Sequence, residues 1–442
     1  MILFLLNLLK IKISIKMILL LTIQIFLIKS QIIIQFEREW VSYPLTKENL
    51  FQNLYRNQLV IKLKIGSEKQ EIPLNIRFRE YESFIFGLEV NQTNLTKFNN
   101  EKSSSFHYIT KTPIKYSFLP FEYAYTFSDT FYFNQSIFEN FPFILVSKLS
   151  KFYSSNYNIF GGGIFGLKRR IYLSQGLEDF NIIKSLKKKN YIKSYAFTFK
   201  FNEENNGKLI IGGYPHQYDK NYKEKNFVKT KAQILSDDLT WAFIFDVTYS
   251  GNEIIEENCQ SDLIIEYGFI VGNKKYYNYI LDLFFNEKIK EGKCYKELNK
   301  IDQREYYFYS CDDNVNVSII PELKFSLKEI EMNFTFNEND LWYNFEGRKY
   351  FLVLFQNYGE VWYLGKPFFK KYQIVFDQDS SVFGFYNENI IKPSYYNYNW
   401  IIIIFLIIII LGLIGYIFNY FLKTPRRKRV NELLEEIDYI SS

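Results

Sequence analysis

The chain has 442 residues, a net charge of +6 and 48% hydrophobic residues. A chain of this length and apolar content can bury a large core and is expected to form about two to three domains, which excludes a disordered protein. Part of the small positive charge lies in a basic cluster after residue 422. No broad basic face for nucleic acid is therefore expected.

The first 31 residues have the pattern of a secretory signal. Three lysines before position 17 precede an uncharged apolar run over 18–28. A basic start followed by an apolar stretch of about 7–15 residues is typical of such signals. We predict a signal peptide over 1–31, with an uncleaved anchor helix as the alternative. Residues 32–54 are then an N-terminal segment or a propeptide.

Between residues 55 and 390 the sequence is typical of β-structure. Short runs rich in β-branched and aromatic residues alternate with turn residues. The clearest runs are 59–65, 195–199, 241–245 and 373–376. Helical periodicity is best at 177–188 and 275–285, each short enough to lie outside a sheet. We predict an all-β body.

Two features of this body occur twice. An apolar lead-in is followed by Arg77 in the first half and by Glu266 in the second. A later apolar-apolar-Gly stretch ends at Gly166 in the first half and at Gly365 in the second, with nearly the same separation along the chain. A duplicated lobe explains both spacings.

The cysteines and glycosylation sequons suit an oxidising compartment. Cys259, Cys294 and Cys311 allow one disulfide and one remaining thiol, and we expect Cys294 to pair with Cys311. Asn-X-Ser/Thr sequons, the acceptors of N-linked glycans, occur at Asn91, Asn94, Asn134, Asn316 and Asn333.

A second apolar run, over 400–422, carries no charged residue. It is long enough to cross a hydrocarbon core about 30 Å thick. Basic residues follow directly, which marks the cytoplasmic side of a membrane span. We predict a transmembrane helix over 400–422 and a cytoplasmic tail over 423–442. The chain would be a single-pass type I membrane protein of the secretory or endomembrane system or the cell surface, with its body lumenal or extracellular.

Several motifs, taken in order, resemble those of the pepsin-like eukaryotic aspartic peptidases, the peptidase A1 family. They are the Ile-Gly turn over 65–70, Gly-Ile-Phe-Gly-Leu over 163–167, Gly-Lys-Leu-Ile-Ile-Gly-Gly over 207–213, the Trp that opens 241–245, the Pro-containing run over 319–325, and the closing signals over 363–377 and 384–385. The resemblance implies an all-β, bilobal fold with two six-stranded-barrel-type lobes around a cleft. The lobes would span 55–228 and 229–390, followed by the C-terminal transmembrane helix.

The resemblance also places Arg77 and Glu266 where paired Asp-Thr-Gly loops each supply a catalytic carboxylate. Such a pair shares one proton and activates a water. Arg77 is a permanent cation and cannot accept a proton. Glu266 still supplies a carboxyl group, and Gly268 still allows the turn. The glutamate side chain is one methylene longer than aspartate, however, and displacing a carboxylate by about 1 Å can lower the rate about a hundredfold. We expect a degenerate site, with Arg77 and Glu266 either in a buried salt bridge or pointing to solvent.

Other residues near the two loops are weaker candidates. Glu80 falls beyond the turn that aims the catalytic side chain, and Asp262 is interpreted as an ordinary loop acid. Asp129 matches a structural Asp-Thr that follows the family's flap. The flap itself is altered, because Tyr116 is its nearest match and 115–120 contains no glycine.

Three functions follow as hypotheses, and whether the chain is an enzyme stays uncertain. The first is a membrane-anchored pseudopeptidase that binds a peptide or protein ligand in its cleft, which the substituted dyad favours. The second is an active aspartic endopeptidase acting at a membrane with a noncanonical dyad. The third is a glycosylated surface or adhesion protein. We expect a monomer that uses no cofactor. We also expect no metal site, because His107 and His216 lie far apart along the chain and do not have the spacing of metal ligands.

Overall fold

The computed structural model describes most of the predicted body. The described residues are 31–39, 46, 50–56, 58–115, 121–133, 136–150, 161–169, 180–202, 206–233, 241–301, 304–356, 359–387 and 433–434. The signal peptide, Tyr116, Asn134 and the predicted helix over 400–422 lie outside these residues. Within the described part of the chain, no helix is long and apolar enough to cross a membrane.

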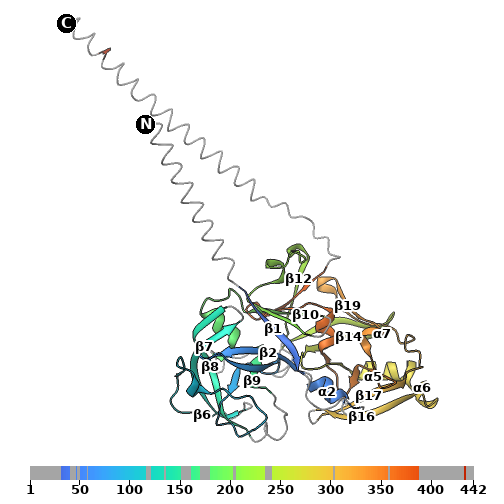
Figure 1. The fold of residues 1–442 in the computed structure, drawn as a ribbon. Coiled ribbons are helices and arrows are strands. Elements are labelled where there is room, and N and C mark those ends of the chain that lie inside the picture. Colours follow the sequence, from blue (N-terminus) through green and yellow to red (C-terminus); the bar gives the residue numbers. More distant parts are fainter. Residues whose placement is uncertain are drawn as a thin grey trace. The chain divides into compact units, whose positions relative to one another are not determined.

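The chain divides into two compact units, 1–390 and 391–442, and all the strands belong to the first (Figure 1). These strands form a 14-stranded and an 11-stranded sheet. The first sheet holds β1 (Ile32–Glu39), β2 (Gln58–Ile65), β3 (Gln70–Arg77), β4 (Phe84–Phe86), β5 (His107–Tyr108), β6 (Ile114–Lys115), β7 (Phe121–Phe133), β8 (Ser136–Leu149), β9 (Gly163–Gly166), β10 (Ala196–Phe201), β11 (Gly207–Ile211), β12 (Phe227–Lys231), β24 (Val375–Asp377) and β25 (Val382–Tyr386). The second holds β13 (Ala242–Ser250), β14 (Glu253–Leu263), β15 (Ile270–Gly272), β16 (Cys294–Ile301), β17 (Arg304–Asp312), β18 (Leu323–Leu327), β19 (Met332–Phe336), β20 (Trp342–Phe345), β21 (Arg348–Phe351), β22 (Val353–Phe355) and β23 (Trp362–Leu364).

Helices are short, as predicted. They are α2 (Leu50–Arg56), α4 (Ile182–Lys188), α5 (Lys274–Ile280), α6 (Asn286–Lys290), α7 (Glu338–Leu341) and α8 (Lys366–Lys371), with a π-helical turn over Leu281–Phe285. The predicted helix over 275–285 is confirmed by α5 and this turn, and α4 confirms the second half of the other. The side chains of Asn181 and Asn273 cap α4 and α5 by accepting hydrogen bonds from first-turn N–H groups.

All four predicted β-runs are confirmed by strands that overlap them. In β2 the burial alternates along the second half of the strand, with Leu63 and Ile65 buried and Lys62 and Lys64 exposed. This period of two is what a strand with one buried face requires. The all-β prediction therefore holds for the described body.

The predicted internal duplication is also confirmed. Strand β9 pairs in parallel with β3 and antiparallel with β4. Strand β23 repeats this arrangement, in parallel with β14 and antiparallel with β15. Each lobe thus supports one strand-loop-strand unit with a third strand that runs between its two arms. The loops of these units carry Arg77 and Glu266.

The segment before residue 55 is built into the body. Strand β1 lies between β11 and β2 in the first sheet. Helix α2 lies beside β16 in the second lobe, where Leu50 and Phe51 are fully buried (Figure 1). The last strands, β24 and β25, join the first sheet through β10 and β12. That sheet therefore combines both ends of the described body with the first lobe.

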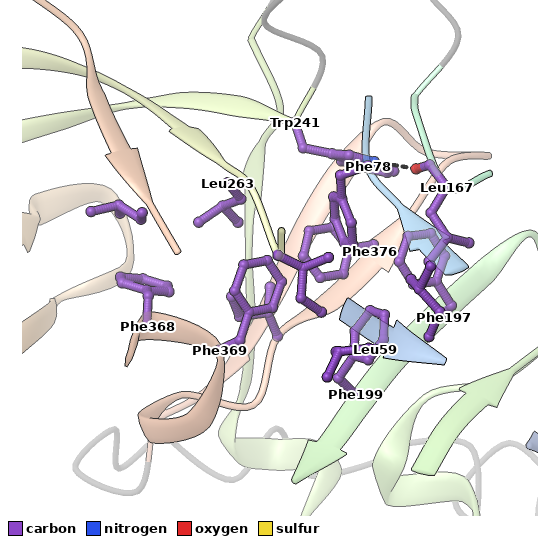
Figure 2. Close-up of a cluster of buried hydrophobic side chains, with 14 of the residues drawn as sticks. Leu59, Phe78, Leu167, Phe197, Phe199, Trp241, Leu263, Phe368, Phe369 and Phe376 are labelled. Carbon is purple, nitrogen blue, oxygen red and sulfur yellow. Dashed lines mark hydrogen bonds between the residues drawn. The ribbon is translucent and has the colours of Figure 1, made fainter. Parts of the chain in front are cut away.

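An aromatic core joins the two halves of the chain behind the site loops (Figure 2). Phe78, from the first loop, packs against Phe369 and Phe376 from the end of the chain, with ring centroids 5.5 and 5.1 Å apart. The indole N–H of Trp241 donates a 2.7 Å hydrogen bond to the carbonyl oxygen of Leu167. These contacts fix the first loop against residues from the second half.

The expected disulfide between Cys294 and Cys311 is present. These two residues face each other on β16 and β17. Cys259 is a buried free thiol that accepts a 2.9 Å hydrogen bond from the hydroxyl of Thr248. Burial raises the pKa of the Cys259 thiol to about 12, so the thiolate form that reacts is disfavoured.

Candidate active site

The first site loop begins at Arg77, the last residue of β3. Arg77 pairs in parallel with Gly166 of β9, and its carbonyl oxygen accepts a 2.7 Å hydrogen bond from the N–H of Leu167. A Cβ at Gly166 would lie within 2.7 Å of three carbonyl oxygens of residues 80–82, so this strand approaches the loop as closely as a glycine allows. This pairing holds Arg77, whose side chain is half-buried, where the two lobes meet.

The second site loop places Glu266 against the first loop. Glu266 lies between β14 and β15 and is only 4% exposed. Its Oε1 accepts hydrogen bonds from the backbone N–H groups of Phe78 and Arg79, at 2.8 and 3.3 Å. The carboxylate therefore connects the two loops directly, and the longer Glu side chain reaches main-chain donors of the opposite lobe.

This geometry is neither of the two arrangements expected from the sequence. Glu266 does not point to solvent. The ion pairs found among the described residues do not join Arg77 to Glu266. Backbone N–H groups take the place of the guanidinium as partners of Oε1, because the loop after Arg77 turns these groups toward the second lobe.

A second contact between the loops involves Arg79 and Tyr267. The guanidinium of Arg79 donates a 2.8 Å hydrogen bond to the Tyr267 hydroxyl and lies 5.4 Å from the centre of its ring. The Tyr267 hydroxyl also lies 3.3 Å from that of Tyr306. Burial raises the pKa of Tyr267, and the positive charge of Arg79 opposes the rise. Tyr267 therefore acts here as a neutral hydroxyl in a buried polar network.

Gly268 lets helix α2 approach the second loop. A Cβ at Gly268 would lie 2.5 Å from the carbonyl oxygen of Leu54 and 3.0 Å from its Cβ. Phe51, one turn earlier, packs on Phe269 and Phe308 with ring centroids 6.1 and 4.4 Å apart. A segment that sequence reasoning set apart as a possible propeptide is thus in close contact with the candidate site.

Replacing Gly268 by alanine is expected to destabilise the protein by about 1–3 kcal/mol, because the new Cβ overlaps backbone atoms of α2 that must move. The effect should be measured by chemical denaturation, with hydrogen exchange of residues 50–56 as a local readout. Gly359→Ala is a matched control, since a Cβ there meets its nearest neighbour at 3.6 Å. Equal stability of the two variants, with unchanged exchange in α2, would contradict the predicted contact.

A sequence model of one family, described as eukaryotic aspartyl protease, matches residues 61–387. The match covers most of the chain and both site loops. The chain belongs to the eukaryotic aspartyl protease family. The two-lobed, mostly β body is consistent with the pepsin-like fold of that family. A comparison with curated proteins found no match.

From the resemblance we expect residues 77–79 and 266–268 at the positions of the two Asp-Thr-Gly loops of eukaryotic aspartyl proteases. The first loop has Arg77, Phe78 and Arg79 in these places, and the second has Glu266 and Tyr267 before the retained Gly268. Phe78 and Tyr267 bring aromatic rings to the two loops, and Phe78 belongs to the core between the lobes.

Asp262 is a further acid at the site, and the interpretation of it as an ordinary loop acid is wrong. It lies on β14, is 4% exposed, and its Oδ1 is buried without a hydrogen-bond partner among the described residues. Burial raises the pKa of Asp262 to about 8; Arg79 opposes this rise and the charge of Glu266 adds to it. No periodicity in the sequence marked this position, because its burial depends on the strands on either side of β14.

Replacing Asp262 by asparagine is expected to remove a pH-dependent loss of stability. The unfolded chain ionises Asp262 near 3.8, whereas the folded chain holds the proton up to about pH 8. Asp262 thus has a higher pKa in the native state than in the unfolded chain. The stability contributed by its bound proton is fully present below pH 3.8 and is lost as the pH rises through about 8. Between pH 5 and 9, the free energy of unfolding of Asp262→Asn should rise relative to the natural protein by about 4 kcal/mol.

The difference between the two proteins isolates this residue, because all other titrating groups are common to both. It should be measured by urea denaturation at one-unit pH steps. Asp312→Asn, at a partly exposed position on β17, is the control and should follow the natural protein. A difference that stays constant with pH would show that Asp262 has an ordinary pKa in the folded state.

Lys366 is a functional candidate that sequence reasoning missed. It follows Gly365 at the start of α8, is 5% exposed, and its backbone N–H donates a 2.7 Å hydrogen bond to the carbonyl oxygen of Tyr267. Burial and the charges of Arg38 and Lys370 lower its pKa well below the usual value, and Glu266 opposes this shift. Its place after the Leu-Gly motif is the one sequence feature that points to it.

Other predicted residues that the structure describes have surface or structural positions. The sequons at Asn91, Asn94, Asn316 and Asn333 are exposed on the surface. Asp129 is buried, and its Oδ1 accepts hydrogen bonds from Ser103, Ser105 and the N–H of Thr130, which suits the structural role that the resemblance implied. Over the described residues, no group of His, Cys, Asp and Glu side chains could hold a metal ion.

Proposed function

We propose that this member of the eukaryotic aspartyl protease family does not hydrolyse peptides and instead binds a peptide or protein segment between its lobes. The observation that carries the proposal is the contact between the two site loops. Oε1 of Glu266 accepts hydrogen bonds from two backbone N–H groups of the first loop. We expect the catalytic dyad of a peptidase at these loops, and that dyad needs two carboxylates around one water. The acid of the second loop therefore holds the lobes together.

The chemistry of the first loop supports the same conclusion. Arg77 has no lone pair with which to accept a proton and stays charged at any working pH. A guanidinium can orient a carbonyl or a carboxylate by hydrogen bonds, but it cannot activate a water as a general base. The site is therefore suited to recognition and not to acid–base catalysis.

Binding of an extended segment is supported by the contact with α2. The carbonyl oxygen of Leu54 comes close to Gly268, so the second loop tolerates main chain from another segment at short range. Strand-type ligands of β-proteins are held by such main-chain approaches together with side-chain pockets. We further propose that the apolar run over 400–422 anchors the body to a membrane, as its length and lack of charge suggest.

Cleavage of a diverse peptide library at pH 3 to 7, with and without pepstatin, tests the proposal. The natural protein should show no pepstatin-sensitive cleavage while remaining folded by circular dichroism. A double variant, Arg77→Asp with Glu266→Asp, tests whether these two positions alone account for the loss of peptidase activity. Pepstatin-sensitive cleavage by the natural protein would overturn the proposal.

Binding should be tested separately with a displayed library of extended peptides. Peptides enriched on the natural protein should bind at least about tenfold more weakly to Arg79→Ala, which loses a half-buried guanidinium at the junction of the loops. Lys208→Ala, an exposed position on β11, is the control. Absence of any enriched peptide, or equal binding to both variants, would contradict a ligand site at these loops.

One observation favours a second candidate function, an active endopeptidase with Asp262 and Glu266 as its acids. Burial, with a smaller contribution from the charge of Glu266, raises the pKa of Asp262 to about 8, so Asp262 holds its proton at neutral pH. Peptidases of this kind rely on two neighbouring carboxyl groups, one of which holds a proton. In that case any pepstatin-sensitive cleavage should disappear in Asp262→Asn and persist in Asp312→Asn.

A further inference from the structure

A cavity of about 670 Å³ lies on the first lobe, away from the site loops. Its lining includes Tyr123 and Tyr125, the polar residues Glu89, Asn91, Gln92 and Lys148, and Pro113. These residues come from the segment after β4, from the segment before β6, and from β7 and β8. The volume falls in the range of roughly 300–1,000 Å³ that small ligands occupy.

One lining residue is itself a glycan acceptor. Asn91 opens the sequon Asn91-Gln92-Thr93, and its side chain is exposed. The neighbouring sequon begins at Asn94, which is also exposed but does not line the cavity. A sugar attached to Asn91 therefore starts at the rim of the cavity, whereas one attached to Asn94 does not.

The lining has the chemistry that a carbohydrate needs. Tyr123 and Tyr125 are half-buried on β7, and an aromatic ring offers a flat apolar face with a polar hydroxyl at its edge. Around them, Glu89, Gln92 and Lys148 supply hydrogen-bond acceptors and donors for sugar hydroxyls. Lys148 lies over the Tyr123 ring at 5.4 Å and forms a 3.0 Å ion pair with Glu122, which orders this wall.

We propose that an N-linked glycan on Asn91 folds back and packs its first sugars into this cavity against Tyr123 and Tyr125. The proposal rests on the secretory topology and not on the proposed ligand at the site loops. In the modification, Nδ2 of Asn91 loses one proton and bonds to C1 of the first sugar of a lipid-linked oligosaccharide, while the lipid pyrophosphate leaves. The glycan then occupies the cavity as a part of the folded lobe.

The test compares the two neighbouring sequons in the full chain, expressed in a eukaryotic secretory host. Site-resolved mass spectrometry follows release of each glycan by an amidase, first from the native protein and then after denaturation. We expect the Asn91 glycan to be released at least about tenfold more slowly than the Asn94 glycan from the native protein, and at an equal rate after denaturation.

Two tyrosine variants separate packing in the cavity from mere crowding. Tyr125→Ala removes a wall of the cavity and should bring release at Asn91 to the rate at Asn94. Tyr108→Ala is the matched control, because its exposed ring contacts Tyr125 at 5.2 Å but does not line the cavity. It should leave the slow release at Asn91 unchanged.

The outcomes that overturn the proposal are direct. An Asn91 that carries no glycan while Asn94 does would remove the proposed occupant. Equal release from both sites in the native protein would show that the glycan lies in solvent. Slow release that persists in Tyr125→Ala would assign the protection to a feature other than this cavity.

Discussion

Replacing Glu266 by alanine is expected to lower the free energy of unfolding by about 3–5 kcal/mol. The substitution leaves the N–H groups of Phe78 and Arg79 without the carboxylate oxygen that they share, in a place that is almost closed to solvent. Hydrogen bonds to a charged group contribute about 1.5–3 kcal/mol each, and a buried donor left unpaired adds its own desolvation cost. The loss should be measured by urea denaturation at pH 7.

Two further variants serve as controls for this measurement. Glu266→Gln keeps one oxygen as an acceptor and should lose less than half as much stability. Glu257→Ala, at an exposed position on β14, should change stability by no more than about 0.5 kcal/mol. A Glu266→Ala protein that is as stable as the natural one would contradict the structural role of this carboxylate and weaken the proposed function with it.

Replacing Phe78 by alanine is expected to cost a similar amount, about 3–5 kcal/mol, which is usual for removal of a fully buried phenylalanine. Its ring lies among Phe197, Phe199, Phe369 and Phe376, with centroids 5.1 to 6.0 Å away (Figure 2). The ring also positions the backbone N–H that donates to Glu266. The variant should therefore weaken the packing between the lobes and the contact between the loops together.

The double variant Phe78→Ala with Glu266→Ala tests that coupling. Because both residues act through the same loop, the combined loss of stability should be smaller than the sum of the two separate losses. Phe78→Leu, which keeps most of the buried volume, should cost less than half as much as Phe78→Ala. Additive losses in the double variant would show that the ring and the carboxylate act independently.

Much of the architecture was predictable because it depends on patterns that repeat along the chain. Alternating burial in runs such as β2 indicates strands, and the two apolar-apolar-Gly stretches predicted two equivalent units. The sequence also predicts substitutions at Arg77 and Glu266, and residue chemistry alone prevents Arg77 from acting as a general base. These features need no knowledge of which segments meet.

The contacts of the site were not predictable in the same way. Glu266 and Phe78 are 188 positions apart, and the orientation of the first loop decides that backbone N–H groups, not Arg77, face the carboxylate. The pKa of Asp262 is raised because neighbouring strands bury its side chain. The pKa of Lys366 is lowered because its side chain is buried at the start of α8, next to the second loop. Nothing local to either residue carries that information.

The sequence by itself therefore determined the family, the all-β duplicated body and the disulfide pairing. Only the tertiary structure decided the hydrogen-bond partners of Glu266 and the burial of Asp262. It also decided that α2 packs against Gly268 as part of the body. The physical reason is that hydrophobic periodicity and residue chemistry are local properties of the chain. Burial, hydrogen-bond partners and pKa shifts arise from segments far apart in sequence that are brought within a few ångströms of each other.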